Sequence, residues 1–192
     1  MRLSGDQRQK KQTDKKESRE ETMAEMAKTM DQAVRVMANR EGKYLTFSLA
    51  GEEYGIGILK VREIIGMMVI TSIPQTPGYV KGVINLRGKV IPVIDLRLKF
   101  GMASTDYTER TCIVVAEIKG GDRIIQIGIV VDSVSEVLNI KPGEIEDTPT
   151  LGARMDMSYI LGMAKMAGGV KILLDIDRVL SDRDFQDVAS AA

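Results

Sequence analysis

The sequence repeats itself in two collinear blocks, and this duplication constrains the fold more than any single residue. The matching positions are mostly small and apolar, and within each block they keep a constant offset. The first block pairs Gly55-Ile56 and Val61-Arg62-Glu63-Ile64-Ile65 with Gly128-Ile129 and Val134-Ser135-Glu136-Val137-Leu138; the second pairs Tyr79-Val80 and Val93-Ile94-Asp95-Leu96 with Tyr159-Ile160 and Leu173-Leu174-Asp175-Ile176. We therefore expect a mainly β fold of two small barrels packed together, each closing its sheet to avoid exposed edges.

The hydrophobic pattern changes from helical to strand-like near Gly42. Leu45, Phe47 and Leu49 alternate with polar residues, and a similar alternation from Tyr54 to Ile58 follows a turn, which predicts a hairpin. Further short apolar runs, separated by turn residues, lie at 67–73, 80–86, 90–94, 111–118, 123–131, 160–166 and 170–176. Tight turns are expected at 87–88, 120–121 and 168–169. Short helices are expected at 61–66, 95–100 and 177–180.

The first 42 residues differ in character from the rest. Residues 6–21 are almost wholly polar or charged and cannot build a core. A methionine-rich stripe within 22–40 predicts an amphipathic helix, which either binds a partner or lies on its own domain. We expect an extension over 1–42, the β domain over 43–182 and a C-terminal tail over 183–192.

Composition excludes several classes of function. The chain has 192 residues and no histidine, so imidazole triads and histidine zinc sites are excluded. Its 27 basic and 27 acidic side chains cancel, and aromatic residues make up 4%, which argues against a nucleic-acid binder. The N-terminus lacks a signal peptide and no later segment is apolar enough to insert into a membrane, so we expect a cytoplasmic protein. We also expect no cofactor.

Three aspartates are the first place to look for chemistry. Asp175 and Asp177, with Asp132 as a third ligand, suit a divalent metal. The favoured interpretation is structural, because Asp177 and Asp95 each precede a predicted short helix and suit its N-cap. The single cysteine, Cys112, lies in an apolar run and is expected to be a buried thiol. No nucleophile, base and oxyanion site come together in the sequence.

Several motifs occur together in a fixed order over residues 43 to about 182. They are Glu53-Tyr54-Gly55-Ile56, Lys60-Val61-Arg62-Glu63-Ile64, Ile73-Pro74 with Pro77, Val80 and Gly82-Val83, Asn85-Leu86-Arg87-Gly88, Gly128 with Val130-Val131-Asp132 and Val134, and a closing strand before Asp175-Ile176. In these motifs the sequence resembles the CheW family of chemotaxis adaptors. The resemblance implies two five-stranded SH3-like barrels around a shared core, in agreement with the internal repeat.

The resemblance also implies a scaffold without catalysis, monomeric when free and recruited to receptor arrays at the membrane. One partner would be the CheW-like regulatory domain of the histidine kinase CheA, and the other the cytoplasmic tip of a chemoreceptor, which enters the groove between the barrels. By motif position, the receptor-binding candidates are Arg87, Asn85, Val134 and Val137. The kinase-binding candidates are Val61, Glu63 and Gly82, with a second kinase contact near Ile145 to Leu151. No metal site is implied.

Each candidate also has an ordinary structural interpretation. Gly82 suits a close approach of two backbones, the three valines suit a core, and Arg87 suits a solvated turn. Two further families of function stay open. One is a metal enzyme, which would use the three aspartates. The other is CheV, whose first domain is CheW-like; it would also need a receiver domain, which we do not expect within the residues up to Ala192.

Overall fold

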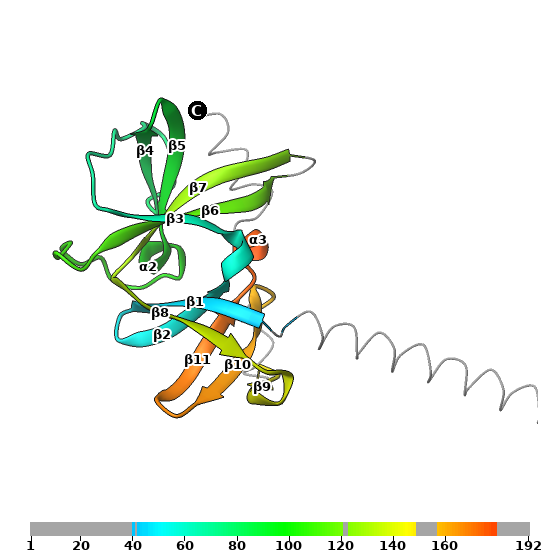
Figure 1. The fold of residues 1–192 in the computed structure, drawn as a ribbon. Coiled ribbons are helices and arrows are strands. Elements are labelled where there is room, and N and C mark those ends of the chain that lie inside the picture. The colour runs from blue at the N-terminus through cyan, green and yellow to red at the C-terminus, as the bar shows by residue number, and fades with distance from the viewer. Residues whose placement is uncertain (1–39, 41, 121–122, 149–156, 180–192) are drawn as a thin grey trace, which may run out of the picture. The chain divides into compact units, whose positions relative to one another are not determined.

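The structure, a computed structural model, describes residues 40, 42–120, 123–148 and 157–179. The predicted helix within 22–40 and both predicted tails lie outside the described residues. The division of the chain at residues 42 and 182 therefore stays a prediction. Figure 1 shows the described part as strands with a few single-turn helices.

The strands form two sheets. The elements are β1 (Gly42–Leu49), β2 (Glu52–Gly57), η1 (Ile58–Lys60), β3 (Val61–Gly66), β4 (Val80–Leu86), β5 (Lys89–Asp95), α2 (Leu96–Lys99), β6 (Cys112–Gly120), β7 (Arg123–Val131), β8 (Ser133–Ile140), η2 (Pro142–Glu144), β9 (Ile145–Glu146), β10 (Ile160–Met166), β11 (Gly169–Leu174) and α3 (Ile176–Val179). Sheet A has the order β8-β1-β2-β11-β10-β9, and sheet B has the order β3-β6-β7-β5-β4. The prediction of a mainly β fold in two units is confirmed (Figure 1).

The two sheets repeat one arrangement. In sheet B the hairpin β4–β5 joins the hairpin β6–β7 through parallel pairing of β5 with β7. In sheet A the hairpin β10–β11 joins the hairpin β1–β2 through parallel pairing of β11 with β2. Sheet A has six strands rather than the expected five, because the two-residue strand β9 pairs with β10.

Two parts of the secondary-structure prediction were wrong. Residues 61–66, expected as a helix, form β3, whose residues alternate between half-buried and exposed and pair with β6. Residues 67–73, expected as a strand, form no strand beyond one bridge between Thr71 and Val83. Strand β8 was not predicted, although its repeat partner β3 occupies the same place in sheet B.

A shared apolar core lies between the sheets. Its buried members come from both sheets, among them Phe47, Ile56, Val114 and Ile129. A smaller cluster in each sheet fills the interior of that unit. The shared core also contains a ladder of stacked rings, Phe47, Tyr54, Phe100 and Tyr159, with successive centroids 6.0, 6.0 and 5.2 Å apart. The largest apolar contact of the described domain is thus the one that holds the two sheets together.

Candidate functional site

The turn between β4 and β5 carries two of the predicted receptor-binding residues. Arg87 and Gly88 both have positive φ, +52° and +85°, as a tight two-residue hairpin turn requires. The side-chain oxygen of Asn85 accepts a hydrogen bond from the Gly88 N–H at 2.9 Å. Asn85 therefore stabilises the turn that presents Arg87 to solvent, where its side chain is 78% exposed.

Arg87 forms an ion pair with Glu63 on β3, which is the edge strand at the other end of sheet B from β4. Its two terminal nitrogens approach the two carboxylate oxygens, with Nη2–Oε2 at 2.7 Å and Nη1–Oε1 at 3.4 Å. This two-point geometry suits the planar guanidinium and fixes its direction better than a single contact would. The structure thus brings one predicted receptor-binding residue and one predicted kinase-binding residue into direct contact.

Gly82 lies inside β4, buried, with φ of +135°. A Cβ at this position would lie 2.0 Å from the carbonyl oxygen of Thr71 and 2.7 Å from its carbonyl carbon. The chain before β4 pairs with the strand here, through two hydrogen bonds of 2.9 Å between Thr71 and Val83. Gly82 therefore permits a close approach of two backbones.

The repeat contains a second such glycine. Gly162 on β10 is buried, and a Cβ there would meet the Glu146 carbonyl oxygen at 2.8 Å and the Ile145 side chain at 2.7 Å. Strand β9 pairs antiparallel with β10 next to this point, in sheet A. The close backbone approach at Gly82 is therefore a structural feature of the fold unit, repeated in both sheets.

The remaining candidates divide between the two sheets. Val61 on β3 and Val134 on β8 are half-buried and pack against the shared core, whereas Val137 on β8 is 49% exposed. Ile145 on β9 is half-buried against the interior cluster of sheet A. Leu151 lies outside the described residues. Five candidates, Val61, Glu63, Gly82, Asn85 and Arg87, lie in sheet B or its β4–β5 turn.

The aspartates hold structural positions. Asp95 caps α2 as predicted, its side chain accepting a hydrogen bond from the Leu98 N–H at 3.3 Å. The assignment of Asp177 as a cap was wrong, because α3 begins at Ile176 and Asp175 accepts the hydrogen bond from the Asp177 N–H. Within the described ranges, no three acidic or cysteine side chains lie close enough together to hold a metal.

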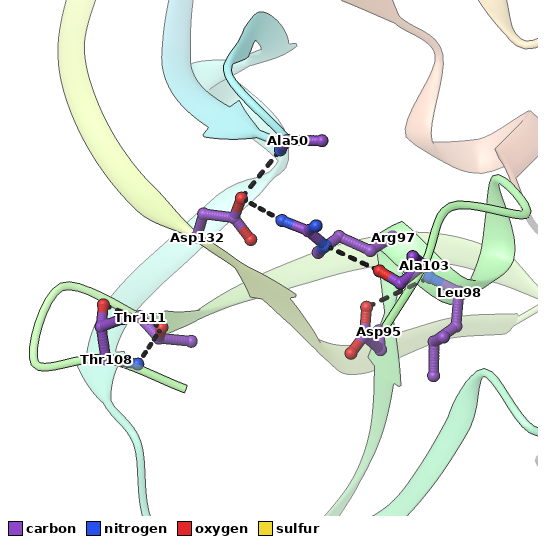
Figure 2. Close-up of polar contacts among 8 residues, drawn as sticks. All are labelled: Ala50, Asp95, Arg97, Leu98, Ala103, Thr108, Thr111 and Asp132. Carbon is purple, nitrogen blue, oxygen red and sulfur yellow. Dashed lines mark hydrogen bonds and ion pairs between the residues drawn. The ribbon is translucent and has the colours of Figure 1, made fainter. Parts of the chain in front are cut away.

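Asp132 lies where β7 passes into β8. Figure 2 shows one of its carboxylate oxygens between two donors, the backbone N–H of Ala50 at 2.8 Å and the guanidinium of Arg97 at 2.6 Å. A hollow of about 510 Å³ opens beside it, lined by Ser48, Thr108, Glu109, Arg110, Asp132 and Ser133. None of the predicted partner-binding residues lines this hollow.

Cys112 at the start of β6 is half-buried rather than fully buried. Burial raises the pKa of its thiol above the ordinary value, which further favours the protonated form at neutral pH.

Some exposed apolar side chains were not anticipated. Leu59 in η1 is 93% exposed and Val69 in the chain before β4 is 87% exposed. The exposure of Leu59 could have been predicted from the sequence, because Leu59 falls out of phase with the alternation of Tyr54, Ile56 and Ile58.

No helix in the described part of the chain has the length and apolar character needed to cross a membrane.

The chain is similar to known proteins over most of its length. The family model of the CheW-like domain matches residues 43–184. A chemotaxis protein CheW from Klebsiella aerogenes is 40% identical over 150 residues, which are 78% of this chain and 88% of that protein. Another, from Rhizobium meliloti, is 32% identical over 155 residues, which are 81% and 97% of the two chains.

A solved structure agrees with these sequence matches. The scaffolding protein TtCheW from Thermoanaerobacter tengcongensis superimposes with a TM-score of 0.65 at 35% identity, over 75% of this chain and 95% of that one. The two-sheet fold, the internal repeat and the family model lead to one conclusion: the chain belongs to the CheW family.

Proposed function

We propose that this chain couples chemoreceptors to the histidine kinase CheA through two surfaces that meet at the Arg87–Glu63 ion pair. The coupling role is that of the CheW family, to which the chain belongs. The observation that carries the proposal is the direct contact between Arg87, a receptor-binding candidate, and Glu63, a kinase-binding candidate. A chain of this kind acts in the cytoplasm and is recruited to receptor arrays at the membrane.

The receptor surface spans both sheets. Asn85 and Arg87 belong to sheet B, and Val134 and Val137 to strand β8 of sheet A. The exposed guanidinium of Arg87 supplies a directional polar contact, and the 49% exposed Val137 supplies apolar area. A receptor tip that contacts both sheets therefore depends on how the sheets are held.

The kinase surface includes one edge of sheet B. Glu63 lies on the edge strand β3, two residues after Val61. The close backbone approach at Gly82 fixes the segment that precedes β4. Gly82 acts on this surface through the backbone that it allows to pass. The second proposed kinase contact begins at Ile145, on strand β9 of sheet A, and its far end at Leu151 lies outside the described residues.

The ion pair supplies a physical route between the partners. A receptor group that binds the Arg87 guanidinium weakens the ion pair and frees Glu63. A kinase group that binds Glu63 likewise weakens the ion pair and frees Arg87. Such a link changes the two affinities by the same factor, because binding free energies are reciprocal. The carboxylate of Glu63 is 27% exposed, so a partner can reach it.

Kinase autophosphorylation in reconstituted receptor membranes tests the proposal. Wild-type protein is expected to activate CheA, and Arg87→Glu is expected to remove this activation, because it places two carboxylates opposite each other. Lys89→Glu is the matched control, since Lys89 is an exposed cation in the same hairpin. Full activation by Arg87→Glu, or equal loss in the control, would contradict the role given to Arg87.

A charge-exchanged variant separates the pair from its partners. Arg87→Glu combined with Glu63→Arg restores an ion pair but reverses what each partner meets. We expect the exchanged protein to remain inactive and folded. Recovery of activation by the exchange would show that the pair is structural and that neither side chain contacts a partner.

A further inference from the structure

The chain passes between the two sheets twice. It leaves sheet A at η1, between β2 and β3, and returns at Asp132, between β7 and β8. Apart from the stacked rings, the contacts of the shared core are apolar and non-directional. An ionic contact, which is directional, lies at each of the two crossings between the sheets.

The contact at the second crossing joins three elements. Asp132 accepts from the guanidinium of Arg97 on α2, the helix that follows β5 of sheet B, at 2.6 Å. It also accepts from the backbone N–H of Ala50, in the β1–β2 turn of sheet A, at 2.8 Å. Figure 2 shows this carboxylate between the two donors. The Asp132 N–H in turn donates to the carbonyl oxygen of Ser48, which lies on β1.

The contact at the first crossing joins the corresponding three elements. Asp177 on α3, the helix that follows β11 of sheet A, accepts from the ammonium of Lys60 on η1 at 2.5 Å. Its other oxygen accepts from the backbone N–H of Lys119, in the β6–β7 hairpin of sheet B, at 2.9 Å. Each contact thus joins a crossing, the helix of one sheet and a hairpin of the other.

The two contacts are equivalent in the repeat but reversed in charge. Asp95 and Asp175 are matched positions in the repeat, so Arg97 and Asp177 also correspond. Between β7 and β8, the connecting chain supplies the carboxylate of Asp132 and the helix α2 supplies the cation of Arg97. Between β2 and β3, the connecting chain supplies the cation of Lys60 and the helix α3 supplies the carboxylate of Asp177. Side-chain exposures of 17% to 33% place all four groups partly out of solvent, where ion pairs are screened less than at the surface.

We propose that Arg97–Asp132 and Lys60–Asp177 form two latches that fix the angle between the sheets, and that their four side chains are positioning residues for the receptor surface. The inference about the receptor rests on the proposed function, because that surface draws residues from both sheets. Kinase binding through β3 uses one sheet and does not require a fixed angle. Losing the latches therefore weakens receptor binding and spares kinase binding by sheet B.

Distance measurement on the isolated chain tests the latches without either partner. Spin labels at Lys89→Cys on β5 and Asn139→Cys on β8, both exposed positions, report on the two sheets in a Cys112→Ser background. Pulsed electron paramagnetic resonance measures the distances between the two labels. In the Arg97→Met/Lys60→Met variant, the distance distribution is expected to be broader than in the wild-type protein or shifted from it. An unchanged distribution in a folded double variant overturns the proposal.

Three controls sharpen the result. Arg62→Met removes an ion pair of 2.5 Å to Glu117 that joins β3 and β6 within sheet B, and should leave the distribution unchanged. Arg97→Lys keeps the charge and should retain the wild-type distribution. If the double variant fails to fold, the two single variants carry the test, and wild-type distributions in both overturn the proposal.

A binding experiment then tests the role of the latches in receptor binding. Receptor binding of the double variant is expected to fall about fivefold or more, the lower range for coupled sites, whereas the kinase contact through β3 is expected to keep its affinity. A changed distance distribution with unchanged receptor binding overturns the positioning role and leaves the latches. Absence of receptor binding by the wild-type protein is a failure of the proposed function, which the distance measurement identifies separately.

Discussion

Replacing Gly82 by alanine should destabilise the domain more than any other glycine substitution in the strands. The added Cβ would lie 2.0 Å from the Thr71 carbonyl oxygen, which belongs to rigid backbone and cannot rotate away. The backbone at +135° is also a region that residues with a Cβ rarely adopt. The steric clash and the backbone strain act together, because neither can be relieved without moving the segment around Thr71 that pairs with β4.

The size of the effect follows from these contacts. Holding a non-glycine residue at this φ costs about 1 to 3 kcal/mol. Displacing Thr71 breaks its two hydrogen bonds to Val83, both 2.9 Å long, at about 1 kcal/mol each. The expected loss is about 4 kcal/mol, which is a large part of the 5 to 15 kcal/mol typical of a folded domain.

Urea unfolding measures this loss. With a slope of about 2 kcal/mol per molar, the midpoint should fall by about 2 M. Gly162→Ala should cost less, because Gly162 has no positive φ and one of its two closest contacts is a side-chain methyl. Gly57→Ala, with no atom within 4 Å, should be nearly neutral. If Gly82→Ala proves as stable as Gly57→Ala, the close-approach account of Gly82 is refuted.

Three further outcomes follow from local geometry. Arg87→Gly should leave the unfolding free energy within about 1 kcal/mol of wild type, because glycine suits the φ of +52°, yet it should remove receptor-dependent kinase activation; a large stability loss would refute this separation. Arg62 lowers the pKa of Glu117, so the stability from this pair is lost as the pH falls through that lowered pKa, and Arg62→Met should raise the Glu117 pKa in an NMR titration. The thiol of Cys112, whose pKa is raised by burial, should react with iodoacetamide at pH 8 more slowly in the folded chain than in urea, and equal rates would contradict the burial.

The sequence predicted the architecture because the fold is duplicated and the repeat is readable in the chain. It predicted the Asp95 cap because the aspartate directly precedes the helical residues. It failed at β3, where Val61, Ile64 and Ile65 fit a helical spacing, and the alternating pattern became decisive only once β6 paired with the strand. Local periodicity cannot register a partner strand some fifty residues away along the chain.

The candidate site was predicted as separate residues rather than as contacts. Arg87 and Glu63 were assigned to different partners, and their ion pair depends on β3 and β4 closing around one unit. Asp132, Arg97, Lys60 and Asp177 come from distant parts of the chain, so their pairing is a product of the two crossings. A charge in a sequence does not name its partner, which only the tertiary fold supplies.

The most direct test of the central claim is whether the chain joins kinase to receptor. Receptor-containing membranes are sedimented with CheA in the presence and absence of the protein, and the kinase in the pellet is measured. The account expects CheA to sediment in quantity only when the protein is present, and Arg87→Glu to abolish this recruitment. Equal sedimentation of CheA with and without the protein would contradict the claim that this chain is the coupling element.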